Sequence, residues 1–233
     1  MTKEPALDLY TILPQTRPWD TLSAEQLAYV IGQSKLQNIK KNGLIYAEGE
    51  DPRTLICILS GKVKIFKTGI EGRNQIVRIV KAGEMLGYRA MFAEEKYVTT
   101  ATAFEPCAIL AIPKQVILDL LHANNELAFA FIRYLSIDLG IADARSVVLT
   151  QNHIRGRLAE SLLHIYEYNG VEETTGNLAI SLSREDLAGL SNMTTSNAIR
   201  TLSSFAEDGL IQVSGRKIRL LDLERLRHIA KFE

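Results

Sequence analysis

Between residues 183 and 217 the chain carries polar side chains whose types and spacing suit hydrogen bonding to a DNA duplex. Thr195, Ser196 and Arg200 fall on one side of a predicted helix, where hydroxyl and guanidinium groups can meet base edges and phosphates. An arginine can bind guanine through both O6 and N7. The candidate DNA-contacting residues are Ser183, Arg184, Thr194, Thr195, Ser196, Asn197, Arg200, Arg216 and Lys217.

Two short helices joined by a tight turn are predicted to position these side chains. Ser183 and Asp186 have the spacing of a capping box at the start of a first helix, roughly 184 to 191. Asn192 is one of the few non-glycine residues that tolerate a left-handed turn, and Thr194 can cap a second helix. Met193 is predicted to fill the angle between the helices. The inward stripe of the second helix is Ala198, Leu202 and Phe205.

A small β-hairpin, the wing, is predicted after the second helix. Gly209 stands where glycine commonly ends a helix, and short strand patterns follow at residues 210–213 and 217–220. Arg216, Lys217 and Arg219 would place positive charge near the tip of this hairpin, in reach of phosphates. The alternative is an ordinary pair of amphipathic helices in an interaction domain. The tight turn, the polar helix face and the basic wing together favour a winged helix-turn-helix.

Net charge gives no support for a nucleic-acid partner. The 233 residues carry 27 basic and 27 acidic side chains, and from residue 152 onward there are ten Lys plus Arg against eleven Asp plus Glu. DNA binding must therefore depend on the local placement of a few arginines, and Glu207 and Asp208 must point away from the phosphates. This neutral half keeps a second hypothesis open, an effector- or partner-binding module with degenerate DNA recognition.

Composition indicates a globular protein, and we expect that it is not an enzyme. Cys57 and Cys107 each lie in an apolar run, which suits buried thiols in a reducing compartment. We expect a cytoplasmic protein with no membrane partner, because the amino terminus lacks the apolar core of a signal peptide and no run of about 18 apolar residues occurs. A metal-dependent β-barrel enzyme is the alternative class, but residues 43–112 contain no histidine to bind its metal.

The order of patterns predicts an α+β chain in three parts. A short helix over about residues 22–34 precedes brief strands from Gly43 to Ile112, whose alternation predicts a small barrel or jelly roll, that is, a double-stranded β-helix. The predicted domains are residues 1–124, with the β-roll; 125–151, a long dimerisation helix and hinge; and 152–233, the winged helix-turn-helix.

Apolar residues repeat at seven-residue intervals along the long helix, which predicts a homodimer axis. The alternative is a helix that lies on its own β domain. The predicted interface residues are Leu127, Ala130, Tyr134, Ile137, Ile141, Ala144 and Val148.

A β-roll, a long helix and a winged helix-turn-helix in this order resemble the family of the cyclic-AMP receptor protein and the fumarate-nitrate reductase regulator, called Crp/Fnr. Residues 45–50, 58–64 and 83–92 look like the three glycine-marked segments of its effector domain, and residues 182–202 align with its helix-turn-helix without a gap. The resemblance implies a homodimeric transcription regulator that binds a palindromic operator, with RNA polymerase as a further partner class and a small molecule as effector. It also implies that an effector signal travels along the dimer helix to the recognition helices.

The departures from the family pattern concern the effector. The glutamate and the Arg-Ser pair that hold cyclic AMP in binding members look replaced by Tyr88 and by Tyr97 and Val98, and the Thr-Ser pair on the dimer helix by Ala142 and Asp143. We therefore predict that cyclic AMP binds poorly or not at all. The candidate residues of an altered effector pocket are Tyr88, Arg89, Tyr97, Thr99, Thr100 and Asp143. Alternatively, the tyrosines fill the cavity and Arg89 pairs with a neighbouring glutamate.

No cofactor is evident from the sequence. The chain has no cysteine before residue 57, which argues against the iron-sulfur cluster of the oxygen-sensing members. Haem stays open as a cofactor because His122, His153 and His164 are present, although a lone helical histidine is usually solvated. In the recognition helix Thr195 and Ser196 stand where family members carry an arginine or valine and a glutamate, whereas Arg200 is retained. The operator sequence is therefore expected to differ from the familiar ones.

Overall fold

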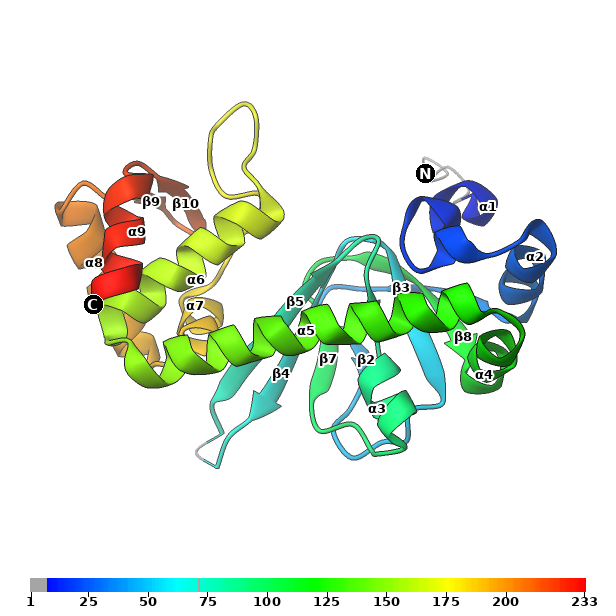
Figure 1. The fold of residues 1–233 in the computed structure, drawn as a ribbon. Helices are drawn as coiled ribbons and strands as arrows, with labels where there is room; N and C mark the ends of the chain where they lie inside the picture. Colours follow the sequence, from blue (N-terminus) through cyan, green and yellow to red (C-terminus); the bar gives the residue numbers. More distant parts are fainter. Residues whose placement is uncertain (1–7, 71) are drawn as a thin grey trace. The chain divides into compact units, whose positions relative to one another are not determined.

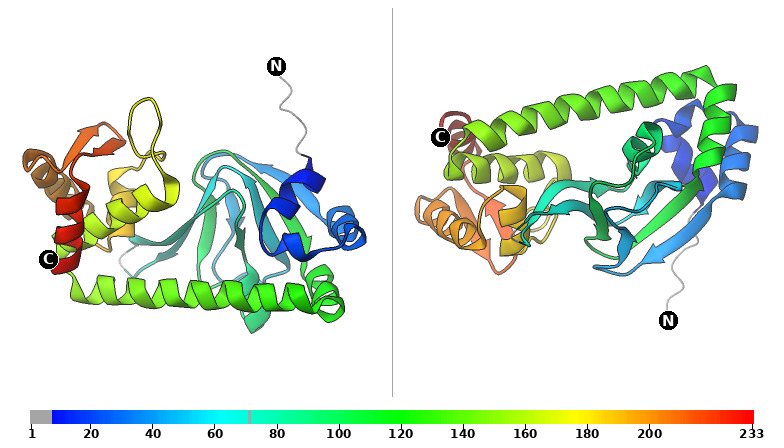
Figure 2. Two further views of the ribbon diagram at one scale, coloured as in Figure 1. Left: turned by 45° about the horizontal axis from the view of Figure 1, so that its top comes forward. Right: turned by 90° about the horizontal axis from the view of Figure 1, so that it is seen from below.

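The computed structural model describes residues 8–70 and 72–233. These form two compact units, one made of residues up to Lys67 together with Val77–Leu139, and the other of Thr68–Ile76 together with Gly140–Glu233. The long helix α5, Asn125–Gln151, passes from the first unit into the second without interruption (Figure 1, Figure 2).

Two antiparallel four-stranded sheets form the β-roll of the first unit. One sheet has the order β1-β8-β3-β6 and the other β2-β7-β4-β5. The strands are β1 Lys35–Ile39, β2 Leu44–Tyr46, β3 Thr54–Ser60, β4 Lys62–Thr68, β5 Asn74–Lys81, β6 Met85–Leu86, β7 Thr100–Ala103 and β8 Cys107–Pro113. The predicted jelly-roll class is confirmed, but the β domain begins at β1 rather than at Gly43. That strand is an edge strand with a largely exposed face, so it lacks the apolar alternation that marks its neighbours.

Side-chain alternation along β3 places its residues in two separate cores. Ile56 and Ile58 point between the two sheets, whereas Leu55, Cys57 and Leu59 point to the opposite face, and all five are buried. A strand covered on both faces needs apolar residues at every position, which accounts for the continuous apolar run.

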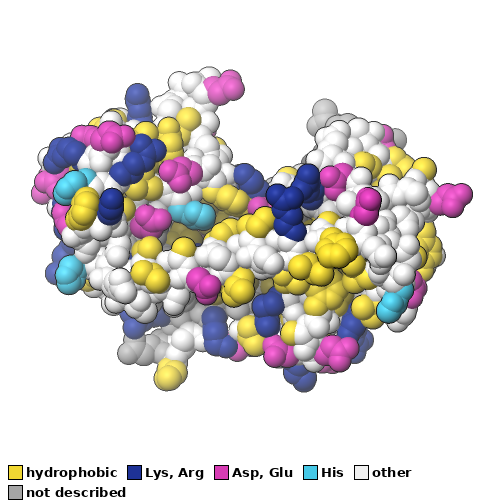
Figure 3. Space-filling model, in the orientation of Figure 1, with side chains coloured by type: hydrophobic (Ala, Val, Ile, Leu, Met, Phe, Trp, Pro, Cys, Tyr) yellow, Lys and Arg dark blue, Asp and Glu magenta, His cyan; other side chains and the backbone are white. Residues whose placement is uncertain are grey.

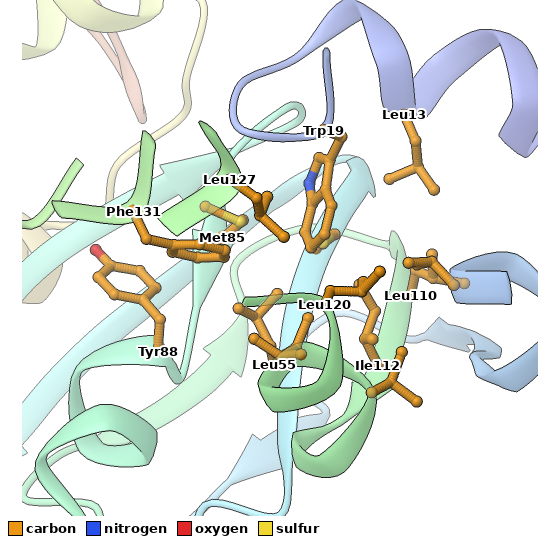
Figure 4. Packing of buried hydrophobic residues seen from close by; sticks show 14 of the residues in the cluster. Leu13, Trp19, Leu55, Met85, Tyr88, Leu110, Ile112, Leu120, Leu127 and Phe131 are labelled. Atoms are coloured by element: carbon orange, nitrogen blue, oxygen red, sulfur yellow. The ribbon is translucent and has the colours of Figure 1, made fainter. Parts of the chain in front are cut away.

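Helices and 3-10 turns cover the outer face of the first sheet. They are α1 Leu9–Ile12, η1 Leu13–Gln15, η2 Trp19–Thr21, α2 Ala24–Gln33, α4 Lys114–Ala123 and the start of α5. Trp19 lies 1% exposed among residues of these helices and the sheet, and its ring meets Phe131 edge to face at 6.2 Å. Figure 4 shows these buried side chains pointing toward one another from the turns, the strands and α5.

One face of the first half of α5 belongs to this core, which corrects the predicted interface. Leu127 is fully buried in the chain's own core and Tyr134 packs against it, on the helix face that also carries Phe131 and Asp138. Leu127 therefore has no surface left for a partner chain, and Tyr134 is half-buried against the same core. The first two positions of the seven-residue series thus lie on a face that packs on the β-roll. Of the other predicted interface residues, Ile137, Ile141 and Ala144 are exposed, and Ala130 and Val148 are half-buried.

The second unit contains a helical scaffold and a small sheet. Its elements are α6 Ile154–Asn169, α7 Arg184–Leu190, α8 Thr195–Glu207, β9 Ile211–Ser214, β10 Lys217–Leu220 and α9 Leu223–Phe232. The carboxy-terminal helix α9 was not predicted. It packs on α6, and Leu226 and Ile229 are its buried anchors. The tip of the β4–β5 hairpin also belongs to this unit, where Arg145 donates to the carbonyls of Ile76 at 2.7 Å and Leu190 at 3.1 Å.

Both cysteines are buried, reduced side chains. Cys57 and Cys107 are 3% and 4% exposed, and burial raises the pKa of each thiol above its usual range. Within residues 8–70 and 72–233, no three histidine, cysteine, aspartate or glutamate side chains gather as a metal site would require. Over the same ranges, none of the helices combines the length and apolar character needed to cross a bilayer.

Candidate nucleic-acid interface

The two helices of the predicted motif begin with the expected caps. Ser183 Oγ accepts from the Asp186 amide at 3.0 Å, and the Asp186 carboxylate accepts from the Ser183 amide at 3.2 Å, so the capping box is confirmed. The Thr194 hydroxyl accepts from the Asn197 amide at 3.2 Å at the start of α8. These bonds satisfy amide groups that would otherwise have no partner at the helix starts.

The turn between α7 and α8 has the geometry that its sequence predicts. Asn192 adopts a left-handed conformation with φ of 47°, and Met193 is 8% exposed in the angle between the helices. Ser191, at the end of α7, is fully buried and donates to Ser161 on α6 at 2.9 Å. The turn is therefore fixed to the scaffold by packing and by a hydrogen bond, and it holds the start of α8 in one direction.

The outward face of α8 presents polar groups to solvent. Thr195, Ser196 and Arg200 are exposed and Asn197 is half-buried, whereas the inward stripe of Ala198, Leu202 and Phe205 is at most 3% exposed. A guanidinium nitrogen of Arg200 donates to Asn197 Oδ1. A guanidinium carries five donors, so those that this bond leaves over can pair with guanine.

The wing forms as predicted, but one of its two candidate cations already has a partner. β9 and β10 pair antiparallel, with Gly215 in the left-handed region at φ 60°. Arg216 is exposed at the tip, whereas Lys217 Nζ lies 3.2 Å from the Glu172 carboxylate. A bond from the Thr175 hydroxyl and then the Lys217 ammonium lower the pKa of Glu172. Arg216 is thus the better placed of the two for phosphate.

An ion pair accounts for one of the two acidic residues at the far end of α8. Arg155, on α6, lies 3.0 Å from Asp208 and 3.0 Å from Glu233, donates to Ser204 Oγ at 2.6 Å, and stacks over the Phe205 ring at 4.9 Å. The guanidinium neutralises Asp208 and packs α6 against α8. The Asp208 carboxylate therefore turns toward α6. The neutral net charge from residue 152 onward thus argues less strongly against DNA binding.

Comparison with known proteins agrees with both units. Residues 36–124 match the family model described as cyclic nucleotide-binding domain, and residues 156–229 match the Crp-like helix-turn-helix domain. The chain belongs to the Crp/Fnr family. It is thus a DNA-binding transcription regulator of the Crp/Fnr type with an effector-binding domain, as the α8 face and its caps indicate.

The relatives are distant but match over most of their length. The chain is 24% identical over 222 residues to the CRP-like cAMP-activated global transcriptional regulator of Mycobacterium tuberculosis, covering 94% of this chain and 99% of that one. A CRP/FNR-family transcriptional regulator from Thermus thermophilus has TM-score 0.70 and 25% identity, over 84% and 98%. The c-di-GMP responsive global regulator CLP of Xanthomonas campestris shares the fold, with TM-score 0.76 and 19% identity over 86% and 100%.

Two tyrosines of the segment that resembles the Crp/Fnr effector site are buried. Tyr88 opens the short helix α3, Tyr88–Ala93, and is 5% exposed; Tyr97 is 6% exposed and stacks on Tyr46, with ring centroids 3.8 Å apart. Burial raises the pKa of Tyr88 and of Tyr97, so both phenols stay neutral. The Tyr97 hydroxyl also lies beside Gly87, where an added Cβ would meet it at 3.2 Å.

Two of the other predicted effector residues act on Tyr46, the stacking partner of Tyr97. Burial raises the pKa of Tyr46, against a side-chain hydrogen bond with Thr99 and the nearby charge of Arg89. Arg89 is exposed and its guanidinium lies 3.1 Å from Glu95, which is the pairing foreseen in the alternative interpretation. Thr100 Oγ1 accepts from the Glu48 amide at 3.1 Å, and Thr99 lies half-buried next to it. Asp143 is exposed and belongs to the second unit.

Sequence reasoning missed two charged residues beside Tyr88. Arg78 on β5 and Asp138 on α5 bind each other at 2.6 Å, and both bind the Tyr88 hydroxyl. Burial disfavours the charge of Arg78, but Tyr88 and Asp138 outweigh it, so the pKa of the guanidinium is raised and its charge is kept. Two features of the sequence could have indicated these residues. Arg78 is a charged residue within the predicted strand pattern 75–80, and Asp138 lies seven residues after the inward-facing Phe131, on the same face of α5.

Proposed function

We propose that the chain is a homodimeric, sequence-specific transcription regulator that binds a two-fold symmetric operator with half-sites about one helical turn apart. The observation that carries the proposal is the exposed face of α8, on which Thr195, Ser196 and Arg200 project while the inward stripe is buried. One such helix per protomer reads one half-site in the major groove. Such a protein works beside the chromosome, in the cytoplasm, with RNA polymerase as a further partner class.

The operator should differ from those of familiar family members. Arg200 offers a guanine contact, but the Ser196 hydroxyl cannot accept from cytosine N4 as a glutamate carboxylate does. Selection from randomised duplexes, followed by anisotropy titration at several salt concentrations, tests the proposal. We expect an enriched palindrome and an affinity that falls linearly on a logarithmic salt scale. Recovery of no enriched sequence would favour the alternative module with degenerate DNA recognition.

The exposed side of α5 supports the dimer. Phe129, Ile132 and Leu139 are 71%, 57% and 64% exposed and lie opposite the buried face of Leu127 and Phe131. Their spacing of three and seven residues is that of a helix-helix seam. In Figure 3, where α5 faces the viewer, hydrophobic side chains gather along it. A second copy of α5 is the partner that this spacing fits. Ile137 and Ile141 from the sequence prediction are also exposed, but they lie on another side of α5.

The variant Ile132→Asp tests that seam. A carboxylate in the apolar contact should yield monomers in light scattering, and it should weaken operator binding more than tenfold, because the two half-sites are then bound independently. Ile70→Asp is the matched control, since Ile70 is a fully exposed isoleucine outside α5. A dimeric Ile132→Asp protein would place the seam elsewhere.

We propose that cyclic AMP is not the effector. Tyr88 and Tyr97, which the resemblance aligns with nucleotide contacts of binding members, are buried, and Arg89 pairs with Glu95. The names of relatives point to different effectors, cAMP for one and c-di-GMP for another. Calorimetry with cyclic AMP should show no heat of binding. Micromolar affinity for that nucleotide would contradict this part of the proposal.

A further inference from the structure

Three side chains from three elements of the first unit meet in what we call the Arg78 cluster, defined as Arg78, Tyr88 and Asp138. Arg78 Nη1 donates to Asp138 Oδ2 at 2.6 Å and lies 3.1 Å from the Tyr88 hydroxyl oxygen. The Tyr88 hydroxyl also donates to Asp138 Oδ2. The cluster thus joins β5 and α3 to α5, where Asp138 lies 60 residues after Arg78 and 50 after Tyr88.

The cluster is shielded from water and supported by a second contact. The Arg78 and Asp138 side chains are 29% and 21% exposed, so their ion pair is screened less than the surface pairs of this unit. Tyr134, one turn before Asp138 on α5, meets the Tyr88 ring edge to face at 5.2 Å. Tyr88 is therefore held to α5 by its ring and by its hydroxyl.

The contacts of these groups are made within the chain, between the β-roll and α5. The Asp138 carboxylate supplies the negative charge that Arg78 pairs with, and the Tyr97 ring stacks on Tyr46 beside Gly87. Removing one member of such a cluster leaves the others desolvated without a partner, so the three act as a unit.

We propose that the Arg78 cluster is an internal latch that takes the place of a bound ligand. It holds α3 on α5 and so keeps the dimer helices in the orientation in which the protein binds DNA without a small molecule. Losing the latch lets α5 sample several orientations, and the fraction of dimers able to bind both half-sites falls. The DNA-binding readout of this proposal rests on the proposed function, whereas the holding of α3 on α5 does not.

The test uses the full chain and two conservative variants. Tyr88→Phe removes one hydroxyl and keeps the ring contact with Tyr134, and Asp138→Asn removes the charge at constant size. Tyr29→Phe and Asp119→Asn are matched controls, because the Tyr29 hydroxyl donates to the Asp119 carboxylate at 3.3 Å on an exposed surface of the same unit. Thermal unfolding confirms that each variant is folded.

Hydrogen exchange and operator titration give the two readouts. We expect amide exchange in α3 and in the facing turns of α5 to rise about tenfold in both cluster variants, and operator affinity to fall about tenfold, while the controls match the parent. Unchanged exchange would overturn the latch. Faster exchange with unchanged or higher DNA affinity would overturn its role in holding the DNA-binding orientation. If the parent enriches no operator, the proposed function fails, and the exchange data alone then decide whether the latch exists.

Discussion

The helices α3 and α8 both start with polar side chains, but the two regions use them in opposite ways. At the start of α8, Thr195, Ser196 and Arg200 project into solvent, and the Arg200 guanidinium donates to Asn197 on the same helix. At the start of α3, Tyr88 turns inward and binds groups from β5 and α5. The first arrangement leaves hydrogen-bonding groups for another molecule, whereas the second uses them within the chain.

The difference shows that residue type alone does not reveal a binding site. Both segments offered hydroxyls and an arginine, and both were candidate sites on the sequence. What separates them is whether the surrounding elements can satisfy the polar groups before a partner arrives. Variants in the two regions should accordingly affect different quantities.

The largest expected effect is on the stability of the β-roll. Tyr97→Ala removes a buried ring that stacks on Tyr46 and should lower the free energy of unfolding by about 3–5 kcal/mol, as for other buried aromatic residues. Urea titration of the purified variant measures this loss, with Val98→Ala, an exposed neighbour, as control. A Tyr97→Ala protein as stable as the parent would mean that the ring fills no core.

In the DNA-binding region a variant should instead affect affinity and leave stability unchanged. Arg200→Ala should weaken operator binding by about 1–3 kcal/mol and relax one base position. Arg227→Ala is the control, because that arginine lies on α9 and pairs with Glu224 and Glu167. Competition titrations against single-base operator variants measure both effects. Equal affinity of the Arg200→Ala variant and the parent would remove α8 from the proposed base contacts.

The smallest effect is expected at the surface of α3. Arg89→Ala breaks an exposed ion pair with Glu95 and should change the free energy of unfolding by less than about 1 kcal/mol. Chemical denaturation measures that change, and operator affinity should also stay at the parent value. A large loss of affinity in this variant would return Arg89 to the effector site that the sequence suggested.

Local rules predicted the DNA-binding region well because its geometry is encoded over short spans. The Ser183 and Thr194 caps, the left-handed Asn192 and the glycine turns each depend on a few consecutive residues. The Arg155 pair with Asp208 was not predicted, since it joins two helices through packing that the sequence does not display.

The contacts of Tyr88 were harder to predict, because they also join separate elements through packing that the sequence does not display. Arg78, Tyr88 and Asp138 are 60 residues apart at the extremes, and nothing in the spacing within each element says that they meet. Along α5, the seven-residue pattern of Leu127 and Tyr134 was real, but it described the contact with the β-roll. A helix with apolar residues on two faces carries two such patterns, and spacing alone does not say which one a partner covers.

The buried state of Cys57 and Cys107 has a practical consequence for testing the proposed dimer. Thiols that are shielded and hard to ionise react slowly with maleimides and methanethiosulfonates, so a single cysteine introduced on α8 can carry a spin label without removal of the native pair. Distances between labels on the two protomers would then report directly on the separation of the recognition helices.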